Sequence, residues 1–138
     1  MLKIGLDIHG VVSSIPEFFS ELTSLLVDSG NEVHILTGSS INDKLLERIN
    51  TYGIRYTHLF SIVDYHQKIG THIHWSNEDN PWIDDKIWNK TKSDYCKEHG
   101  IQLMLDDSIE YAQYFDTPYA LLLSKCIVKH KPMFIDKN

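Results

Sequence analysis

The sequence predicts an α/β fold: a single-domain, doubly wound, Rossmann-like parallel sheet of about five strands with helices on both faces. Short apolar runs of strand length alternate with longer segments whose apolar residues repeat at helical spacing. Glycines follow most of the helix-length segments, where helices commonly end. Strands that are separated by helices pair in parallel through right-handed crossovers, and this alternation therefore predicts the sheet.

The amino-terminal half predicts two strands, each followed by a helix. The first helix opens at Pro16, a residue that is favoured in the first helical turn. Its apolar residues form one stripe, which comprises Phe18, Phe19, Leu22, Leu25 and Leu26. Asn42 or Asp43 is the expected cap of the second helix. The two strands are expected at residues 2–6 and 32–36, and the helices end at Gly30 and Gly53.

The second half predicts a third strand and an insertion before the alternation resumes. Residues 54–63 are rich in β-branched and aromatic side chains, which favours a strand. The polar stretch at 64–85 fits no regular pattern, and we expect it to form a small insertion, either a lid or a hairpin. Helices at 87–99 and 108–115 and strands at 101–105 and 119–123 complete the prediction.

Composition limits the classes of function. A chain of 138 residues that is 42% hydrophobic can bury a core without disulfides, and we expect residues 1–138 to form one domain. The net charge of −6 gives no broad basic surface, which argues against general nucleic-acid binding and membrane-surface binding. No stretch has transmembrane length, no signal peptide is recognisable, and the two cysteines form no CxxC pair. A cytoplasmic location is therefore expected.

Polar side chains follow three of the predicted strands directly. They are Asp7 and His9 after the first strand, Thr37, Gly38 and Ser39 after the second, and Asp106 and Asp107 after the fourth. Each group alone is weak evidence, because acids and hydroxyls after strands commonly form turns or helix caps. A parallel sheet brings all three groups to one edge, where ligands bind in such folds. Their convergence predicts a functional site.

The order and spacing of these segments resemble the haloacid dehalogenase-like hydrolases. In that family an apolar strand leads into DxDG, a second strand ends in Thr or Ser, a lysine follows, and a last strand ends in DD or GDxxxD. The corresponding segments here are residues 4–12, residues 34–38, a lysine before the last motif, and residues 103–108. The resemblance covers roughly residues 2–123. It implies a small member without a large cap, because residues 12–32 leave room only for a helix.

The resemblance implies phosphoryl-transfer chemistry at the acids. Asp7 would attack a phosphomonoester and form an aspartyl-phosphate, which splits one difficult displacement into two easier ones. Mg²⁺ would offset the repulsion between this carboxylate and the dianionic phosphate. Asp7 and Asp106 would bind the ion through side-chain oxygens, and Asp107 would support them. His9 would contribute its backbone carbonyl oxygen.

The hydroxyl segment and a lysine would bind the phosphoryl group. Thr37, with the amide of Gly38 or Ser39, would donate hydrogen bonds to a phosphoryl oxygen. Lys92 is the favoured lysine, because it lies near the start of the helix that leads into the Asp106 strand, where the family places its lysine. Lys90 is the second choice. The ammonium group would offset the negative charge that develops at phosphorus.

His9 is the departure from the family pattern. Phosphatases of the family usually carry an aspartate at this position, which protonates the leaving oxygen and later activates water. Histidine transfers protons near neutral pH and is a chemically reasonable replacement. A histidinium beside Mg²⁺ is disfavoured, however, and this opposes a role as an acid.

Two interpretations therefore stay open. One is a hydrolase of a small phosphate ester, with a nucleotide-like substrate suggested by the aromatic content; the other is a catalytically degenerate protein that binds magnesium and phosphate, or a partner. A phosphoacceptor signalling domain is disfavoured, because receivers place their paired acids on the first strand and their lysine last. Without a large cap the site is expected to be open, and a homo-oligomer is one way to close it.

Overall fold

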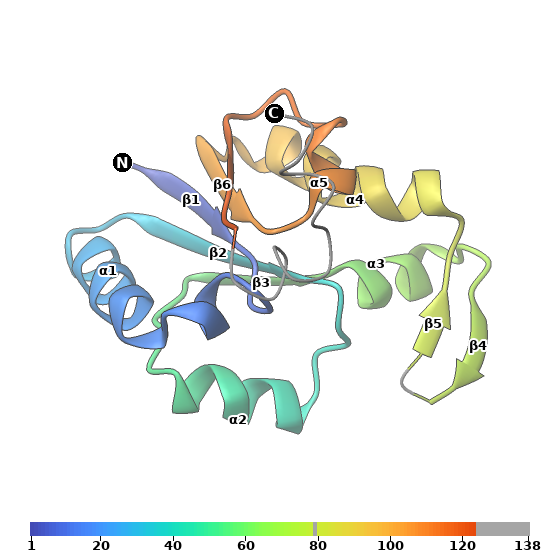
Figure 1. The fold of residues 1–138 in the computed structure, drawn as a ribbon, viewed down its shortest axis with the longest axis horizontal. Coiled ribbons are helices and arrows are strands. Elements are labelled where there is room, and N and C mark those ends of the chain that lie inside the picture. Colours follow the sequence, from blue (N-terminus) through green and yellow to red (C-terminus); the bar gives the residue numbers. More distant parts are fainter. Residues whose placement is uncertain (79, 124–138) are drawn as a thin grey trace.

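The computed structural model describes residues 1–78 and 80–123. Its core is a five-stranded sheet in which every neighbouring pair of strands is parallel (Figure 1). Along the sheet the strands are β3 (His58–Ser61), β2 (Glu32–Thr37), β1 (Lys3–Leu6), β6 (Leu103–Asp106) and β7 (Tyr119–Leu121). The predicted fold class is confirmed.

The strand order distinguishes between two doubly wound topologies. Counted in chain order among themselves, the five parallel strands follow the order 3-2-1-4-5. This is the Rossmann order, whereas receiver domains follow 2-1-3-4-5. Strands β2 and β3 lie on one side of β1, and β6 and β7 lie on the other side. The order in which strands are added therefore reverses between β1 and β6, and ligands bind at such a switch point. The topology excludes the receiver interpretation and places the expected site at the ends of β1 and β6.

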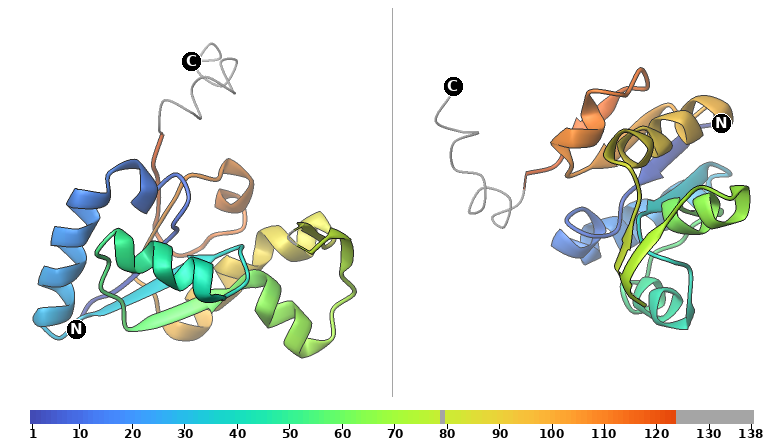
Figure 2. Two further views of the ribbon diagram at one scale, coloured as in Figure 1. Left: turned by 90° about the horizontal axis from the view of Figure 1, so that it is seen from below. Right: turned by 90° about the vertical axis from the view of Figure 1, so that its right-hand side faces the viewer.

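Helices cover both faces of the sheet (Figures 1 and 2). Helices α1 (Pro16–Asp28) and α2 (Asp43–Thr51) lie on one face, and α3 (Ile62–Ile69) and α4 (Asp85–His99) lie on the other. Two short helices, η1 (Val12–Ser14) and α5 (Ile109–Ala112), lie in connections.

Alternating side chains of β2 supply both cores. Val33 and Ile35 join the core beneath α1 and α2, whereas Leu36 joins the core beneath α4. Because successive strand residues point to opposite faces, a strand that is buried on both faces needs apolar residues at consecutive positions, as at Ile35 and Leu36.

The third predicted strand, at residues 54–63, is too long. Strand β3 ends at Ser61, and Ile62 and Val63 are the first residues of α3. The cause is a cap: the Ser61 hydroxyl accepts a hydrogen bond from the Asp64 N–H at 3.1 Å and starts the helix. Ile62 and Val63 are buried in the structure. Buried apolar residues of this kind occur in both strands and helices, so their apolar character does not distinguish the two.

The insertion predicted at 64–85 is confirmed and consists of most of α3 followed by a hairpin. The antiparallel strands β4 (His74–Asn77) and β5 (Asn80–Trp82) project away from the main sheet (Figure 1). Asp84 then caps α4 by accepting hydrogen bonds from backbone N–H groups, so the helix begins before the predicted residue 87. The later elements at 101–105, 108–115 and 119–123 are each shorter or shifted in the structure.

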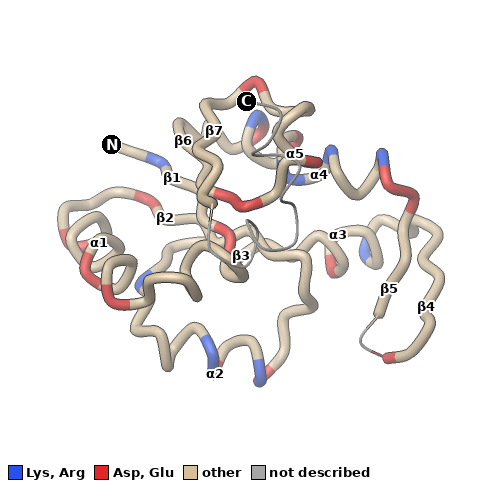
Figure 3. The backbone as a smooth tube through the Cα atoms, viewed as in Figure 1, with Lys and Arg blue, Asp and Glu red and all other residues tan. Residues whose placement is uncertain are grey.

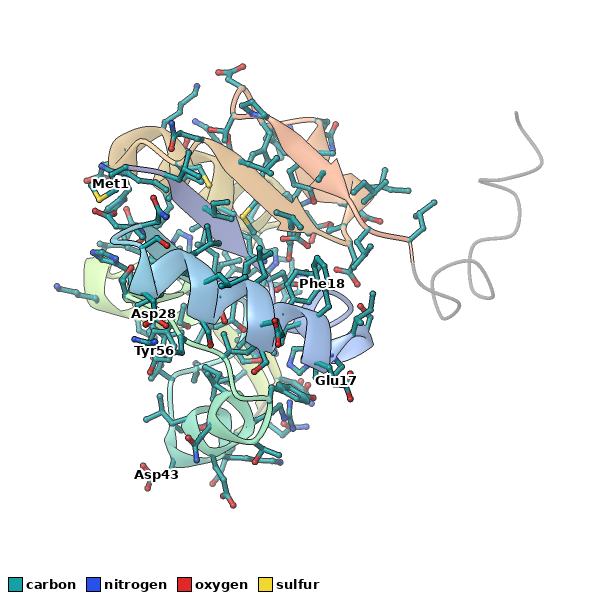
Figure 4. All side chains as sticks on the ribbon, turned by 90° about the vertical axis from the view of Figure 1, so that its left-hand side faces the viewer. Met1, Glu17, Phe18, Asp28, Asp43 and Tyr56 are labelled. Carbon is teal, nitrogen blue, oxygen red and sulfur yellow. The ribbon has the colours of Figure 1, made fainter. Side chains whose placement is uncertain are left out.

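Helix α1 buries a narrower stripe than predicted. Phe19 is buried, and Leu22 and Leu26 pack against the core. Phe18 and Leu25 are 54% and 64% exposed, and Phe18 is labelled on α1 in Figure 4. They lie on one flank of the helix, beyond the strip that meets the sheet.

Two further expectations concern cysteines and the membrane. Among the described residues, no helix combines the length and apolar character that crossing a bilayer requires. Cys96 is a free thiol on the buried face of α4. Cys126 and the last part of the predicted 1–138 domain lie outside the described residues.

The adjacent residues Phe18 and Phe19 provide a direct test of which face α1 buries. Phe19→Ala is expected to lower the free energy of unfolding by about 3–5 kcal/mol, because it leaves a cavity in the core. Phe18→Ala is expected to change it by less than about 0.5 kcal/mol, because the ring is largely exposed. Urea unfolding of both variants measures the difference. Equal losses would show that the predicted wide stripe, with both rings in the core, was right.

Candidate metal and phosphate site

Three acidic side chains meet at the switch point of the sheet. Strands β1 and β6 pair with Leu6 opposite Leu105, so the next residues, Asp7 and Asp106, are neighbours. Carboxylate oxygens of Asp7, Asp106 and Asp107 all lie within 4.8 Å of one another. Asp7 and Asp106 are buried, and Figure 3 shows acidic positions beside the ends of the central strands. The predicted convergence of these acids is thus present in the structure.

Lys92 from α4 joins two of the three acids. Its Nζ donates to Asp7 Oδ1 at 3.0 Å and to Asp106 Oδ2 at 2.8 Å, and its side chain is only 2% exposed. The alternative, Lys90, is exposed and lies 4.0 Å from Asp94 on the same helix. Lys92 is therefore the lysine that the fold places between the acids.

The acids outnumber the cation at this site. Burial raises the pKa of Asp7; the Lys92 ammonium opposes this shift, and the Asp106 charge adds to it. Burial, together with the charges of Asp7 and Asp106, raises the pKa of Asp107 to about 7. Burial alone would lower the pKa of Lys92, but the two carboxylates outweigh burial and raise it. Three carboxylates beside one ammonium group form a cluster that is able to bind a metal cation.

Gly10 allows the loop after β1 to approach Asp107 closely. Its φ is +82°, and a Cβ built there would lie 1.9 Å from Asp107 Oδ2. The Gly10 N–H donates to Ser13 Oγ at 2.9 Å, which fixes the turn. A side chain at residue 10 would displace Asp107, and the glycine of the first motif is therefore needed for the geometry of the acids.

Asp106 serves the turn after β6 as well as the site. Its Oδ1 accepts backbone N–H groups of Asp107 at 2.8 Å and Ser108 at 3.3 Å. Its Oδ2 accepts from Lys92. The cap of α5 is a different residue, Ser108, whose hydroxyl accepts from Tyr111. The Asp106 carboxylate therefore closes the turn with one oxygen and contacts Lys92 in the site with the other.

The hydroxyl segment at the end of β2 consists of Thr37, Gly38 and Ser39. Gly38 and Ser39 lie at the pocket beside the acids, whereas Thr37 is buried. Thr37 Oγ1 accepts the Ser39 N–H at 3.1 Å, and Thr37 is fully buried. Gly38 and Ser39 line the pocket above, whereas Thr37 does not. A Cβ at Gly38 would lie 2.9 Å from the Trp88 ring, so the glycine lets this loop pack under the tryptophan. Phosphate binding by Thr37, Gly38 and Ser39 stays a prediction.

A pocket of about 660 Å³ opens above the acids. This volume is typical of small-molecule sites. Asp7, His9 and Lys92 lie in its floor and wall, and α2 and the β4–β5 hairpin supply residues to its sides. The Trp88 indole donates to the Tyr111 hydroxyl at 2.8 Å, and Lys92 Nζ lies 5.1 Å from the centre of the Tyr111 ring. These aromatic contacts fix the surroundings of the buried lysine.

Sequence reasoning missed two cations in the pocket. Lys44 and Arg48 lie four residues apart on α2 and both line the pocket. Residues at this spacing share one helix face. The spacing of Lys44 and Arg48 indicates a pair of cations on one face of α2. Their place at the site follows only when the structure shows that α2 borders the pocket.

His9 is exposed at the pocket and contacts Arg48. Its Nε2 lies 3.4 Å from Arg48 Nη1. A guanidinium only donates hydrogen bonds, so Nε2 is the acceptor and the ring proton of the neutral form is on Nδ1. The role of His9 in proton transfer, and that of its carbonyl in metal binding, stay predictions.

Comparisons of the chain with protein-family models, with curated proteins and with solved structures found no match. The structure shows a parallel α/β sheet with a buried acidic cluster that is able to bind a metal ion.

The role of Lys92 in stability can be separated from that of a surface lysine. Lys92→Met is expected to lower the free energy of unfolding by about 3–5 kcal/mol at neutral pH, because it leaves Asp7 and Asp106 buried without their counter-ion. Lys90→Met removes an exposed ion pair and is expected to cost less than about 1 kcal/mol. Chemical denaturation measures both; similar losses would contradict the buried ion pairing.

Asp107 gives the metal-free protein a distinct pH dependence. Its pKa is raised from 3.8 to about 7 on folding, so the stability linked to its proton is present below about pH 4 and is lost as the pH rises through about 7. The unfolding temperature of the metal-free wild type is expected to fall across this range. Asp107→Asn is expected to flatten the fall, and thermal scans across pH measure it. Identical profiles for the two proteins would contradict the raised pKa.

Proposed function

We propose that this protein is a magnesium-dependent phosphohydrolase that cleaves a phosphomonoester through an aspartyl-phosphate on Asp7. The observation that carries the proposal is the placement of Lys92 between Asp7 and Asp106 at the floor of an open pocket. The motif resemblance to the haloacid dehalogenase-like hydrolases supports the same assignment, because that family uses a first-strand aspartate, a lysine and last-strand acids in this order.

Magnesium would be held by Asp7 and Asp106, with Asp107 in support and the backbone carbonyl of His9 as a further ligand. The observation that favours an ion here is the gathering of three carboxylates within 4.8 Å of one another beside a single ammonium group. Burial and the neighbouring carboxylate charges raise the pKa of Asp7 and of Asp107, and a bound cation would oppose both shifts. When bound, the ion supplies the charge that allows a phosphate dianion to approach a carboxylate.

Two displacements at phosphorus make up the reaction. An Asp7 oxygen forms a bond to phosphorus as the bond from phosphorus to the leaving oxygen breaks, and the leaving oxygen takes a proton from His9 or from solvent water. Water then attacks phosphorus, inorganic phosphate leaves, and the Asp7 carboxylate is regenerated. Lys92 stabilises the charge on the phosphoryl oxygens, and Gly38 and Ser39, which line the pocket, with Thr37 beneath them, are the proposed hydrogen-bond donors.

The pocket favours a small organic phosphate ester as the substrate. Trp75 and Trp88 line it, and their rings are suited to stacking on a planar group, which supports a nucleotide-like phosphomonoester. Lys44 and Arg48 add positive charge on the α2 side. The β4–β5 hairpin borders the opening, and a second copy of the chain is a further candidate for closing it.

Turnover and its dependence on Asp7 provide the primary test. Purified protein is incubated with p-nitrophenyl phosphate and a panel of nucleoside monophosphates, with and without Mg²⁺. Phosphate release is expected from the wild type only with Mg²⁺, and Asp7→Asn is expected to abolish it by removing the nucleophile. Asp43→Asn, in the first turn of α2, is the matched control and is expected to retain activity. Equal activity of wild type and Asp7→Asn would overturn the proposal.

A catalytically degenerate protein that binds magnesium and phosphate, or a partner, is the second candidate. The observation that favours it is the Arg48 contact at His9 Nε2, which occupies one ring nitrogen where the family has an acid. It predicts no turnover by the wild type, while aluminium or beryllium fluoride still binds at Asp7. That result would exclude the hydrolase and retain the ligand site.

His9 can be tested directly by restoring the acid. His9→Asp is expected to raise kcat about 100-fold, because a carboxyl group would supply general acid–base catalysis at the leaving oxygen. His9→Asn, which cannot transfer a proton, is expected to lower kcat below the wild-type value. An unchanged or lower rate for His9→Asp would show that the family's acid is not the missing component.

A further inference from the structure

A second cluster of metal-ligating side chains lies toward the opposite ends of the strands. Glu32 and His34 are two residues apart on β2, and His58 on β3 is the register partner of His34. Residues at these positions project from one face of the sheet. One donor atom from each of the three residues lies within 4.8 Å of the others. The two imidazole rings stack with their centres 4.0 Å apart.

Hydrogen bonds orient both imidazoles through the same ring nitrogen. His34 Nδ1 lies 2.8 Å from the Tyr95 hydroxyl, and His58 Nδ1 lies 2.8 Å from Thr57 Oγ1. The Thr57 hydroxyl donates its proton to the Val33 carbonyl, so it accepts from His58 Nδ1. This leaves the lone pair of His58 Nε2 available. Ligating histidines in proteins are commonly held in this way by the nitrogen that does not bind the metal.

We propose that Glu32, His34 and His58 form a metal site separate from the acid cluster, and that it takes a divalent transition-metal ion, with Zn²⁺ as the best match. Two imidazoles and one carboxylate are a donor set that zinc accepts, and it completes its coordination with water. Mg²⁺ prefers oxygen donors and octahedral geometry, and it is not expected to bind here.

Zinc would replace the hydrogen bond between His34 and Glu32. In the metal-free protein His34 Nε2 lies 2.8 Å from Glu32 Oε1, and because a carboxylate only accepts, Nε2 carries the ring proton. On binding, that proton moves to Nδ1, the Tyr95 hydroxyl turns from donor to acceptor, and Nε2 binds the metal. The imidazole stays neutral, and no proton is gained or lost.

The rearrangement that the site needs is small. Ligands of a tetrahedral zinc ion are about 3.4 Å apart, since each lies about 2.0–2.2 Å from the metal. The Glu32 and His34 donors are closer than this at 2.8 Å, and the widest separation in the cluster is under 4.8 Å. Glu32 is partly exposed and His58 is exposed, so both side chains can move, whereas His34 is held in the core.

The cluster is distinct from the acids that line the pocket. Helix α4 runs past both, with Lys92 at the acids and the Tyr95 hydroxyl at His34. The three residues Glu32, His34 and His58 do not line the pocket. A zinc ion here would cross-link β2 to the edge strand β3. We therefore assign it a structural role.

Zinc titration in excess Mg²⁺ tests the site, because under the proposed function Mg²⁺ is expected to occupy the acid cluster. Zinc-free wild-type protein in that buffer is expected to bind one Zn²⁺ by calorimetry, with a rise in unfolding temperature. Glu32→Gln and His58→Ala are expected to weaken binding at least about tenfold and to remove that rise. His74→Ala, an exposed histidine on β4, is the matched control and should bind as the wild type does.

Histidine side-chain NMR gives a readout that simple destabilisation would not produce. Zinc is expected to shift the ring signals of His34 and His58 and to move the His34 proton from Nε2 to Nδ1, while the signals of His72 and His74 stay unchanged. Mg²⁺ is expected to leave all four unchanged. Lys3→Gln is expected to tighten zinc binding, because Lys3 faces Glu32 across β1 and β2 and repels a cation. Zinc binding that is unaffected by Glu32→Gln and His58→Ala would overturn the proposal.

Discussion

The buried ammonium of Lys92 is the interaction on which the site depends. It contacts Asp7 from β1 and Asp106 from β6, and it comes from α4, which is far from β1 in the sequence. Two carboxylates at the ends of adjacent buried strands repel each other, and without a cation between them the sheet would carry uncompensated charge. The crossover that brings α4 over the sheet therefore positions the counter-ion as well as connecting the strands. Helix α4 thus covers the sheet and also supplies the positive charge of the site.

The single ammonium group of Lys92 cannot neutralise three ionised carboxylates, so the site would carry a net negative charge. Burial, together with the charges of Asp7 and Asp106, raises the pKa of Asp107, and a metal cation at the three carboxylates would offset this unfavourable charge. At the other end of β2, Glu32 and His34 contact each other directly, beside His58. The protein thus separates a hard, oxygen-only donor set from a nitrogen-containing one along the same sheet.

Much of the fold was readable because the sheet is buried on both faces. The apolar residues of β1 and β2 and the glycines that follow α1, α2 and α4 predict the alternation and its parallel pairing. What failed were boundaries set by single hydrogen bonds. Ser61 caps α3 and shortens the third strand, although Ile62 and Val63 look like strand residues. Helix α1 buries a narrower strip than its apolar residues suggest, since the width of the contact is set by the sheet and not by the helix.

The sequence by itself determined that Asp7, Thr37 and Asp106 gather at one edge of a parallel sheet, because residues that follow parallel strands share that edge. Only the tertiary structure decided which lysine reaches the acids, since Lys90 and Lys92 differ by their direction around α4 and not by residue type. It also brought Arg48 to His9 and His58 to His34. Those pairs join separate elements, and contacts of this kind follow from how helices and strands pack in space, which local sequence patterns do not specify.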